Sequence, residues 1–180
     1  MVGRKYQLRK RAEGLDATRE RIVEATAALH YEQGVVATSY IQIAERAGVG
    51  AATVYRHFPT LGSLVNACGA HVYEITQPPL PENAPAVFAG LDTRQQRLER
   101  LVAELDAYYD RASVWLGIAA RDRDRVPELD KALQGVAAGV EALVREAAGA
   151  GSSDAVIRLM TALADVSVWQ SLKRLDAPPA

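Results

Sequence analysis

Apolar residues recur along this chain at intervals of three and four, the spacing that gathers side chains on one face of an α-helix. Ile22, Ala25 and Leu29 follow this spacing, and Leu101 and Leu105 repeat it further along the chain. No stretch alternates polar and apolar residues between turn signals, as a half-buried strand would. The pattern therefore predicts an all-α fold.

Cap and stop residues divide this pattern into separate helices. Ser39 begins a capping box with Gln42, and Gly34 and Gly48 each follow a periodic segment as stop signals. Pro127 suits the first position of a long helix. We expect helices at about residues 16–33, 39–47, 51–57, 60–72, 92–110, 114–121, 127–148 and 153–175.

Residues 39–58 have the order of features that a helix-turn-helix requires: a short helix, a tight turn and a second short helix. Ala44 and Ala47 are small enough for two helices to approach closely, and Gly48 supplies the positive φ of the turn. The alternative is a helical hairpin inside a larger bundle. The short helices and the turn glycine favour a DNA-binding unit.

The second helix of this unit has one apolar and one polar face. Val54 and Phe58 are four residues apart and point inward, whereas Thr53, Arg56 and His57 gather on the opposite side. Arg56 is the candidate for reading guanine, because its guanidinium forms two hydrogen bonds with one base. We expect the DNA contacts to come from Thr38, Ser39, Gln42, Gly50, Ala51, Ala52, Thr53, Tyr55, Arg56 and His57.

Charge is distributed unevenly along the chain. Residues 1–60 hold nine Lys and Arg against six Asp and Glu, whereas residues 61–180 hold twelve against sixteen. Arg4 and Lys5 belong to a basic start that suits a flexible arm neutralising phosphates. The alternative is a solvated or vector-derived tail. The run at residues 121–125, which alternates Arg and Asp, reads as a solvated loop.

Composition excludes several classes of protein. The 49% of hydrophobic and 24% of charged residues are typical of a globular protein, and no apolar run approaches the roughly 20 residues that span a bilayer. The N-terminus lacks the apolar segment of a secretion signal, so we expect a cytoplasmic protein. His30, His57 and His71 have no metal-ligand spacing, and no phosphate loop or nucleophile motif appears. We expect neither an enzyme nor a cofactor.

The motif Ile-Ala-Glu-Arg-Ala-Gly-Val-x-x-x-Thr-Val-Tyr-Arg-His-Phe at residues 43–58 resembles the DNA-binding domain of the tetracycline-repressor (TetR) family. The resemblance covers about residues 17–68. It implies an all-helical homodimer that binds a partly palindromic operator and releases it when a small-molecule effector enters the second domain. It also implies phosphate contacts by Thr53, Tyr55 and His57, and base contacts by Gly50, Ala51, Ala52 and Arg56.

This sequence departs from the family pattern at three positions. Gly50 stands where a serine often caps the recognition helix, and Leu61 stands where a lysine commonly meets the backbone. Ile41 is apolar at a position that is often polar. These changes affect affinity and operator sequence more than the DNA-binding role.

Four prolines in residues 77–85 interrupt the helical pattern, which makes this segment a natural boundary. We divide the chain into a flexible basic arm (1–15), a helix-turn-helix domain (16–60) and a helical effector-binding and dimerisation domain (61–180). Candidate effector contacts are Phe88, Tyr108, Tyr109, Trp115, Met160 and Trp169, unless these residues are plain core.

The last two expected helices, 127–148 and 153–175, carry apolar stripes with many small residues. Small residues permit close helix approach, as a four-helix dimer interface requires. They include Gly135, Ala137, Ala138, Gly139 and Ala142. The alternative is packing within one chain. The alternative function is a helical protein-interaction module without DNA binding.

Overall fold

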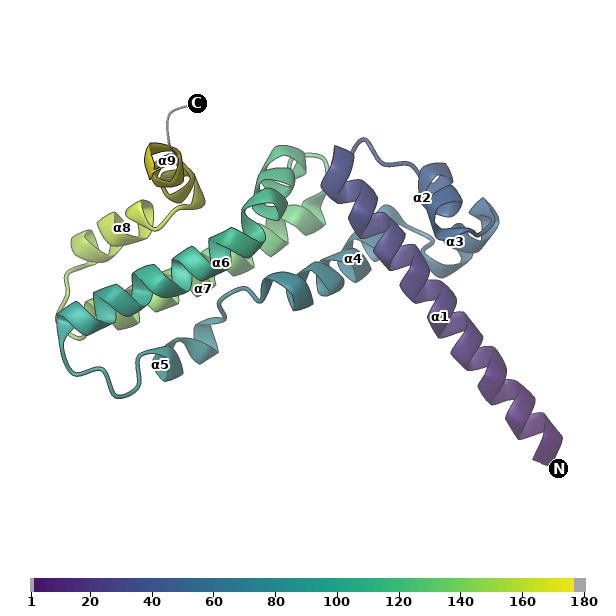
Figure 1. Cartoon of the computed structure of the whole chain (residues 1–180), viewed down its shortest axis with the longest axis horizontal. Helices are drawn as coiled ribbons and strands as arrows, with labels where there is room; N and C mark the ends of the chain where they lie inside the picture. The colour runs from purple at the N-terminus through teal and green to yellow at the C-terminus, as the bar shows by residue number, and fades with distance from the viewer. Residues whose placement is uncertain (1, 177–180) are drawn as a thin grey trace.

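The computed structural model describes residues 2–176, which form helices and contain no strand (Figure 1). The elements are α1 (Val2–Gln33), α2 (Tyr40–Ala47), α3 (Ala51–His57), α4 (Leu61–Thr76), the 3-10 segment η1 (Pro81–Asn83), α5 (Ala84–Val87), α6 (Arg94–Asp122), α7 (Pro127–Ala148), α8 (Asp154–Leu163) and α9 (Val166–Asp176). The all-α prediction is confirmed. Among the described helices, none combines the length and the apolar character needed to cross a membrane.

The first helix begins earlier than predicted. α1 runs from Val2 to Gln33 without interruption, so residues 2–15 are helical where we expected a flexible arm. That stretch is rich in Arg, Lys and Leu, which are favourable helix formers, and it holds no proline. The predicted start at residue 16 was wrong because this propensity carries the helix past Gly14. The first turns of α1 project beyond the other helices (Figure 1).

The N-terminal helices share one apolar core, in which Ile22, Val54 and Leu64 have no exposed surface. Burying side chains of this size stabilises the fold by about 1.5–3 kcal/mol each. The short α2 and α3 are thus held against α1 and the first turn of α4. The buried members of this core are Ile22, Val23, Ala25, Leu29, Ile43, Ala44, Ala47, Val54, Phe58 and Leu64.

The long helices α6 and α7 run side by side and form the body of the second domain (Figure 1). α6 is one helix from Arg94 to Asp122, not the two helices predicted over 92–110 and 114–121. Residues 111–113 contain no proline or glycine, and Ala112 is buried against the core. The apolar face therefore continues through the predicted break and keeps the helix whole.

The C-terminal segment forms two helices, α8 and α9, where a single helix over 153–175 was predicted. The Tyr109 hydroxyl donates a hydrogen bond to the Ala164 carbonyl at 2.6 Å. The Asp165 carboxylate accepts from the Ser167 backbone N–H at 2.8 Å, which satisfies a free donor at the start of α9. A contact between residues distant in sequence thus stabilises a break that local periodicity does not reveal.

The proline-rich segment packs on the second domain, since η1 and α5 both contact α7. Gly139 of α7 lies so close to Pro79 that an added Cβ would overlap the Pro79 carbonyl. We expected Gly139 at a dimer interface, but the structure uses it for packing within the chain.

A small apolar cluster joins the helix-turn-helix region to the second domain. Val35 follows α1, Val65 lies on α4, Ile118 lies on α6, and Val126 precedes α7. All four are buried, and Trp115 and Leu129 pack beside them. The helix-turn-helix region is therefore attached to the second domain through an apolar contact with residues of α6 and α7.

Candidate nucleic-acid interface

The capping box at the start of α2 is confirmed. The Ser39 hydroxyl accepts from the Gln42 backbone N–H at 3.3 Å, and the Gln42 Oε1 accepts from the Ser39 N–H at 2.9 Å. The Thr38 hydroxyl donates to the Gly34 carbonyl at 2.7 Å. The structure therefore brings together three of the predicted DNA contacts, Thr38, Ser39 and Gln42, and hydrogen bonds fix each of them.

Gly48 forms the turn between α2 and α3 with a φ of 64°. The next residue, Val49, donates its N–H to the Ala44 carbonyl at 3.0 Å. A Cβ built on Gly48 meets no atom within 4 Å, so the left-handed backbone, and not a lack of space, favours glycine here. The turn is therefore the one that the sequence predicted.

The apolar face of α3 points inward as predicted, but of the three residues expected opposite it only Arg56 is exposed. Val54 and Phe58 are 0% and 1% exposed, whereas Tyr55 is 55% exposed and Arg56 is also exposed. Thr53 is half-buried at the edge between the faces. The exposed side therefore carries a guanidinium and a phenol, both of which bind phosphates or base edges.

The start of α3 offers few hydrogen-bonding side chains. Gly50 is its N-cap and makes no side-chain cap bond. Ala52 is exposed, whereas Ala51 is half-buried and packs against the core. Among the positions predicted to face bases, Arg56, at the other end of the helix, is therefore the one with a hydrogen-bonding side chain.

Tyr40, the first residue of α2, supports the exposed face, a role that the sequence did not predict. Its hydroxyl donates to the Phe58 carbonyl at 3.0 Å, and its ring centroid lies 4.5 Å from that of Tyr55. Burial, and to a lesser degree Tyr55, raises the pKa of the Tyr40 phenol. Tyr40 thus holds both the end of α3 and the ring of Tyr55. No local motif signals this role, because it depends on a contact between two helices.

His57 is less accessible than its place in the motif predicted. Its Nε2 is buried and has no hydrogen-bond partner in the described part of the chain. A phosphate contact by His57 would therefore use Nδ1 or would require the ring to turn. Another cation, Arg19 of α1, lies beside α3 with its guanidinium 5.1 Å from the centroid of the Phe58 ring. Arg4 and Lys5 belong to α1, but their side chains lie outside the described part of the structure.

Residues 22–68 match the family model "Bacterial regulatory proteins, tetR family". These residues therefore form a DNA-binding domain of the tetR family. The matched range begins in α1, ends in α4 and contains the whole helix-turn-helix described above. The presence of this domain indicates that the protein is a DNA-binding transcriptional regulator and not an enzyme. A search of the curated proteins finds no match.

Solved structures share the fold across most of the chain. The multidrug binding protein EbrR, solved with imidazole, is 21% identical with a TM-score of 0.60, over 89% of this chain and 82% of EbrR. NalD from Pseudomonas aeruginosa, the secondary repressor of the MexAB-OprM multidrug efflux pump, is 20% identical with a TM-score of 0.60, over 92% of this chain and 90% of NalD. At these identities the likeness concerns the fold alone.

Five of the six candidate effector residues meet in the second domain. Phe88, Tyr108 and Tyr109 are buried there, and Met160 and Trp169 pack against the same cluster. The Tyr109 ring centroid lies 5.2 Å from Tyr108 and 5.8 Å from Trp169. Burial raises the pKa of both tyrosines, so both phenols remain neutral at physiological pH.

Trp115 lies apart from these residues. It packs in the cluster between the domains, and its ring meets that of Tyr31 edge-on, with 5.2 Å between centroids. Trp115 also lines a groove of about 340 Å³ formed by α1, α4 and α6. The other residues lining this groove are Glu24, Ala27, Ala28, Tyr31, Glu32, His71 and Ile75.

A buried pair links α1 to α4 behind the helix-turn-helix. The Cys68 Sγ lies 3.6 Å from the His30 Nδ1. Burial lowers the pKa of His30 to about 4, although the carboxylate of Asp122 opposes this shift, and burial raises the pKa of Cys68 to about 12. Both groups are thus neutral near pH 7. Among the described residues, no three His, Cys, Asp or Glu side chains are grouped to hold a metal ion.

Proposed function

We propose that this regulator is a ligand-responsive repressor, which binds a partly palindromic operator as a homodimer and releases it when a small molecule binds the second domain. The observation that carries the proposal is the helix-turn-helix with its exposed Tyr55 and Arg56, attached to a separate helical body. We assign residues 16–60 to DNA binding and residues 61–180 to effector binding and dimerisation. The site of action is the cytoplasm, where the operator lies.

Selection of bound fragments from random duplex DNA by the purified protein tests the operator. We expect two related half-sites about 34 Å apart, one helical turn of DNA, with binding that weakens as salt rises. Arg56→Ala should cost about 1–3 kcal/mol of specific binding and relax base preference. Arg145→Ala, an exposed arginine on α7, is the control and should leave both unchanged. Absence of salt-sensitive DNA binding would favour the helical interaction module instead.

The apolar surface of α8 and α9 supports the homodimer. Leu159 and Leu163 are 62% and 61% exposed on α8, and Leu172 and Leu175 are also exposed on α9. Exposed leucines on consecutive helices are typical of a protein–protein contact. Light scattering should find a dimer that Leu159→Ser with Leu163→Ser converts to a monomer. Val102→Ser, at another exposed apolar position, should remain a dimer.

The aromatic cluster around Tyr109 and Trp169 supports the effector site. A small-molecule pocket needs apolar and aromatic walls with few polar groups, and this cluster has that composition. Binding there would shift α4 and change the spacing of the two recognition helices, with a coupling of about 1–3 kcal/mol. Trp169→Ala should change the effector response and leave operator affinity nearly intact. Trp115→Ala is less selective, because Trp115 also packs between the domains.

A further inference from the structure

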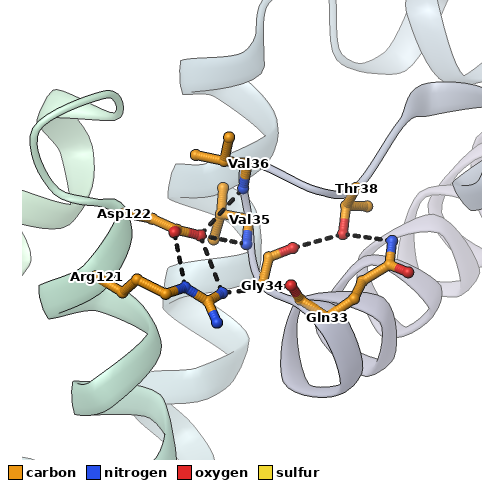
Figure 2. A network of polar contacts seen from close by, with 7 residues as sticks. All are labelled: Gln33, Gly34, Val35, Val36, Thr38, Arg121 and Asp122. Carbon is orange, nitrogen blue, oxygen red and sulfur yellow. Dashed lines mark hydrogen bonds and ion pairs between the residues drawn. The ribbon is translucent and has the colours of Figure 1, made fainter.

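Asp122, the last residue of α6, extends its carboxylate to the backbone that follows α1 (Figure 2). Its Oδ2 accepts hydrogen bonds from the N–H of Val35 at 2.8 Å and from the N–H of Val36 at 3.1 Å. The residue is only 6% exposed. The sequence predicts a solvated loop over residues 121–125, and for Asp122 that prediction is wrong.

Arg121 completes this contact. Its Nε donates to the Asp122 Oδ1 at 3.0 Å, and its Nη2 donates to the Gln33 carbonyl at 3.3 Å. The first of these bonds is the largest cause that holds the pKa of Asp122 below its ordinary value, so the carboxylate stays charged. Gly34 has a φ of 94°, and an added Cβ would overlap the Arg121 guanidinium. The loop is thus shaped to admit both side chains of α6.

The same loop is bonded to the start of α2. The Gly34 carbonyl accepts from the Thr38 hydroxyl at 2.7 Å, and the Gln33 Nε2 donates to the Thr38 Oγ1 at 3.2 Å (Figure 2). The Gln33 Nε2 also donates to the Gln42 Oε1 at 3.4 Å, and this oxygen belongs to the capping box of α2. A continuous set of hydrogen bonds therefore runs from Asp122 to the residues that begin the helix-turn-helix.

The loop has few ways to satisfy the Val35 amide without Asp122. Val35 is 3% exposed and packs against Ile118 and Val126, so water has little access to its N–H. Removing the acceptor of a buried amide lowers the free energy of unfolding by about as much as a strong hydrogen bond contributes to it. Asp122 therefore determines where this backbone lies relative to α6.

We propose that Asp122 is a positioning residue for DNA binding, which fixes the α1–α2 loop and, through it, the start of α2. When α6 moves, the two amides of the loop either move with it or lose their acceptor. The positioning of Thr38, Ser39 and Gln42 thus depends on the second domain. This inference rests on the proposed function only in its use of operator binding as one readout.

The test compares Asp122→Ala and Asp122→Asn with Asp130→Asn. Alanine removes the acceptor, whereas asparagine keeps one carbonyl oxygen for the two amides and loses the charge that pairs with Arg121. Asp130 is the matched control, because it pairs with Arg123 near the start of α7 and makes no bond to the loop. Amide hydrogen exchange is measured on free protein, and operator affinity is measured with the selected duplex.

We expect exchange at Val35 and Val36, and in the first turn of α2, to be about 10-fold faster or more in Asp122→Ala, with operator affinity about 10-fold weaker. Asp122→Asn should change both by about 3-fold, and Asp130→Asn by less than about 2-fold. If Asp122→Ala does not fold, the asparagine variant decides the outcome.

Unchanged exchange in residues 35–42 of a folded Asp122 variant overturns the proposal, whatever its operator affinity. Faster exchange with unchanged operator affinity overturns it too, because the loop would then not position the DNA contacts. If the wild type binds no duplex in a salt-dependent way, the proposed function fails. The exchange measurement then still decides whether Asp122 fixes the loop.

Discussion

α6 makes two polar attachments through aspartates, one to the helix-turn-helix region and one to α9. Asp106 accepts from the Trp169 Nε1 at 2.8 Å and from the Lys173 Nζ at 2.9 Å. Its side chain is 47% exposed, whereas that of Asp122 is 7% exposed. Water competes for the partners of Asp106 but hardly reaches the Val35 amide that Asp122 holds. We therefore expect hydrogen bonds of similar length to contribute very differently to stability. The contact of Asp122, which is less accessible to water, should contribute more than that of Asp106.

The largest expected difference is between removal of the two carboxylates. Asp122→Ala should lower the free energy of unfolding by about 3 kcal/mol, because the buried Val35 amide loses a charged acceptor. Asp106→Ala should lower it by less than about 1 kcal/mol, because solvent replaces its partners. Urea denaturation of both variants measures the difference. Equal losses would show that exposure does not separate the two attachments.

Acid should lower the stability of the folded protein through His30, which is buried near Asp122. Burial depresses the His30 pKa from 6.5 to about 4. Between these values the unfolded chain binds a proton that the folded chain does not, so stability falls as the pH decreases from 6.5 to 4. The loss at pH 4 should reach about 3 kcal/mol.

Urea denaturation from pH 7 to pH 4 measures this loss. His30→Gln, which cannot titrate, should flatten the slope in that window. Asp122 does not produce the same window, because Arg121 above all holds its carboxyl pKa below 3.8. Its contribution is present above that ordinary value and is lost only at still lower pH. An unaltered slope in His30→Gln would contradict the assignment.

A smaller effect is expected at the loop that receives Asp122. Gly34→Ala should lower the free energy of unfolding by about 1–2 kcal/mol, because alanine is strained at a φ of 94° and displaces Arg121. Gly117→Ala is the control, since Gly117 lies within α6 with open space around it. It should be neutral or slightly stabilising. Thermal unfolding measures the melting temperature of both variants, and equal shifts in melting temperature would contradict the expected strain at residue 34.

The smallest effect is expected at the exposed attachment. Trp169→Phe removes the N–H that binds Asp106 but keeps a ring beside Tyr109. We expect a loss of about 1 kcal/mol or less, measured by urea denaturation. A loss as large as that of Asp122→Ala would mean that the contact with α9 is as important as the contact with the loop.

The sequence predicted the helix-turn-helix because its determinants are local. Ser39 and Gln42 are three residues apart, and Gly48 needs only its own backbone conformation to form the turn. Val54 and Phe58 share a face for reasons of helical spacing alone. These features lie within 20 residues and depend little on the rest of the molecule.

The features that the sequence did not predict depend on distant contacts. Asp122 meets amides 86 and 87 residues away, and the Tyr109 hydroxyl binds a carbonyl 55 residues away. A charged run and an apolar run give no local sign of either contact. The role of Tyr40 and the position of Trp115 between domains were missed for the same reason.

α4 contributes two consecutive residues to two different cores. Leu64 belongs to the core of the helix-turn-helix region, and Val65 belongs to the cluster shared with α6. Consecutive residues of a helix point about 100° apart, so rotation of α4 about its own axis would withdraw both side chains from their cores. The two cores therefore oppose rotation of α4 about its own axis.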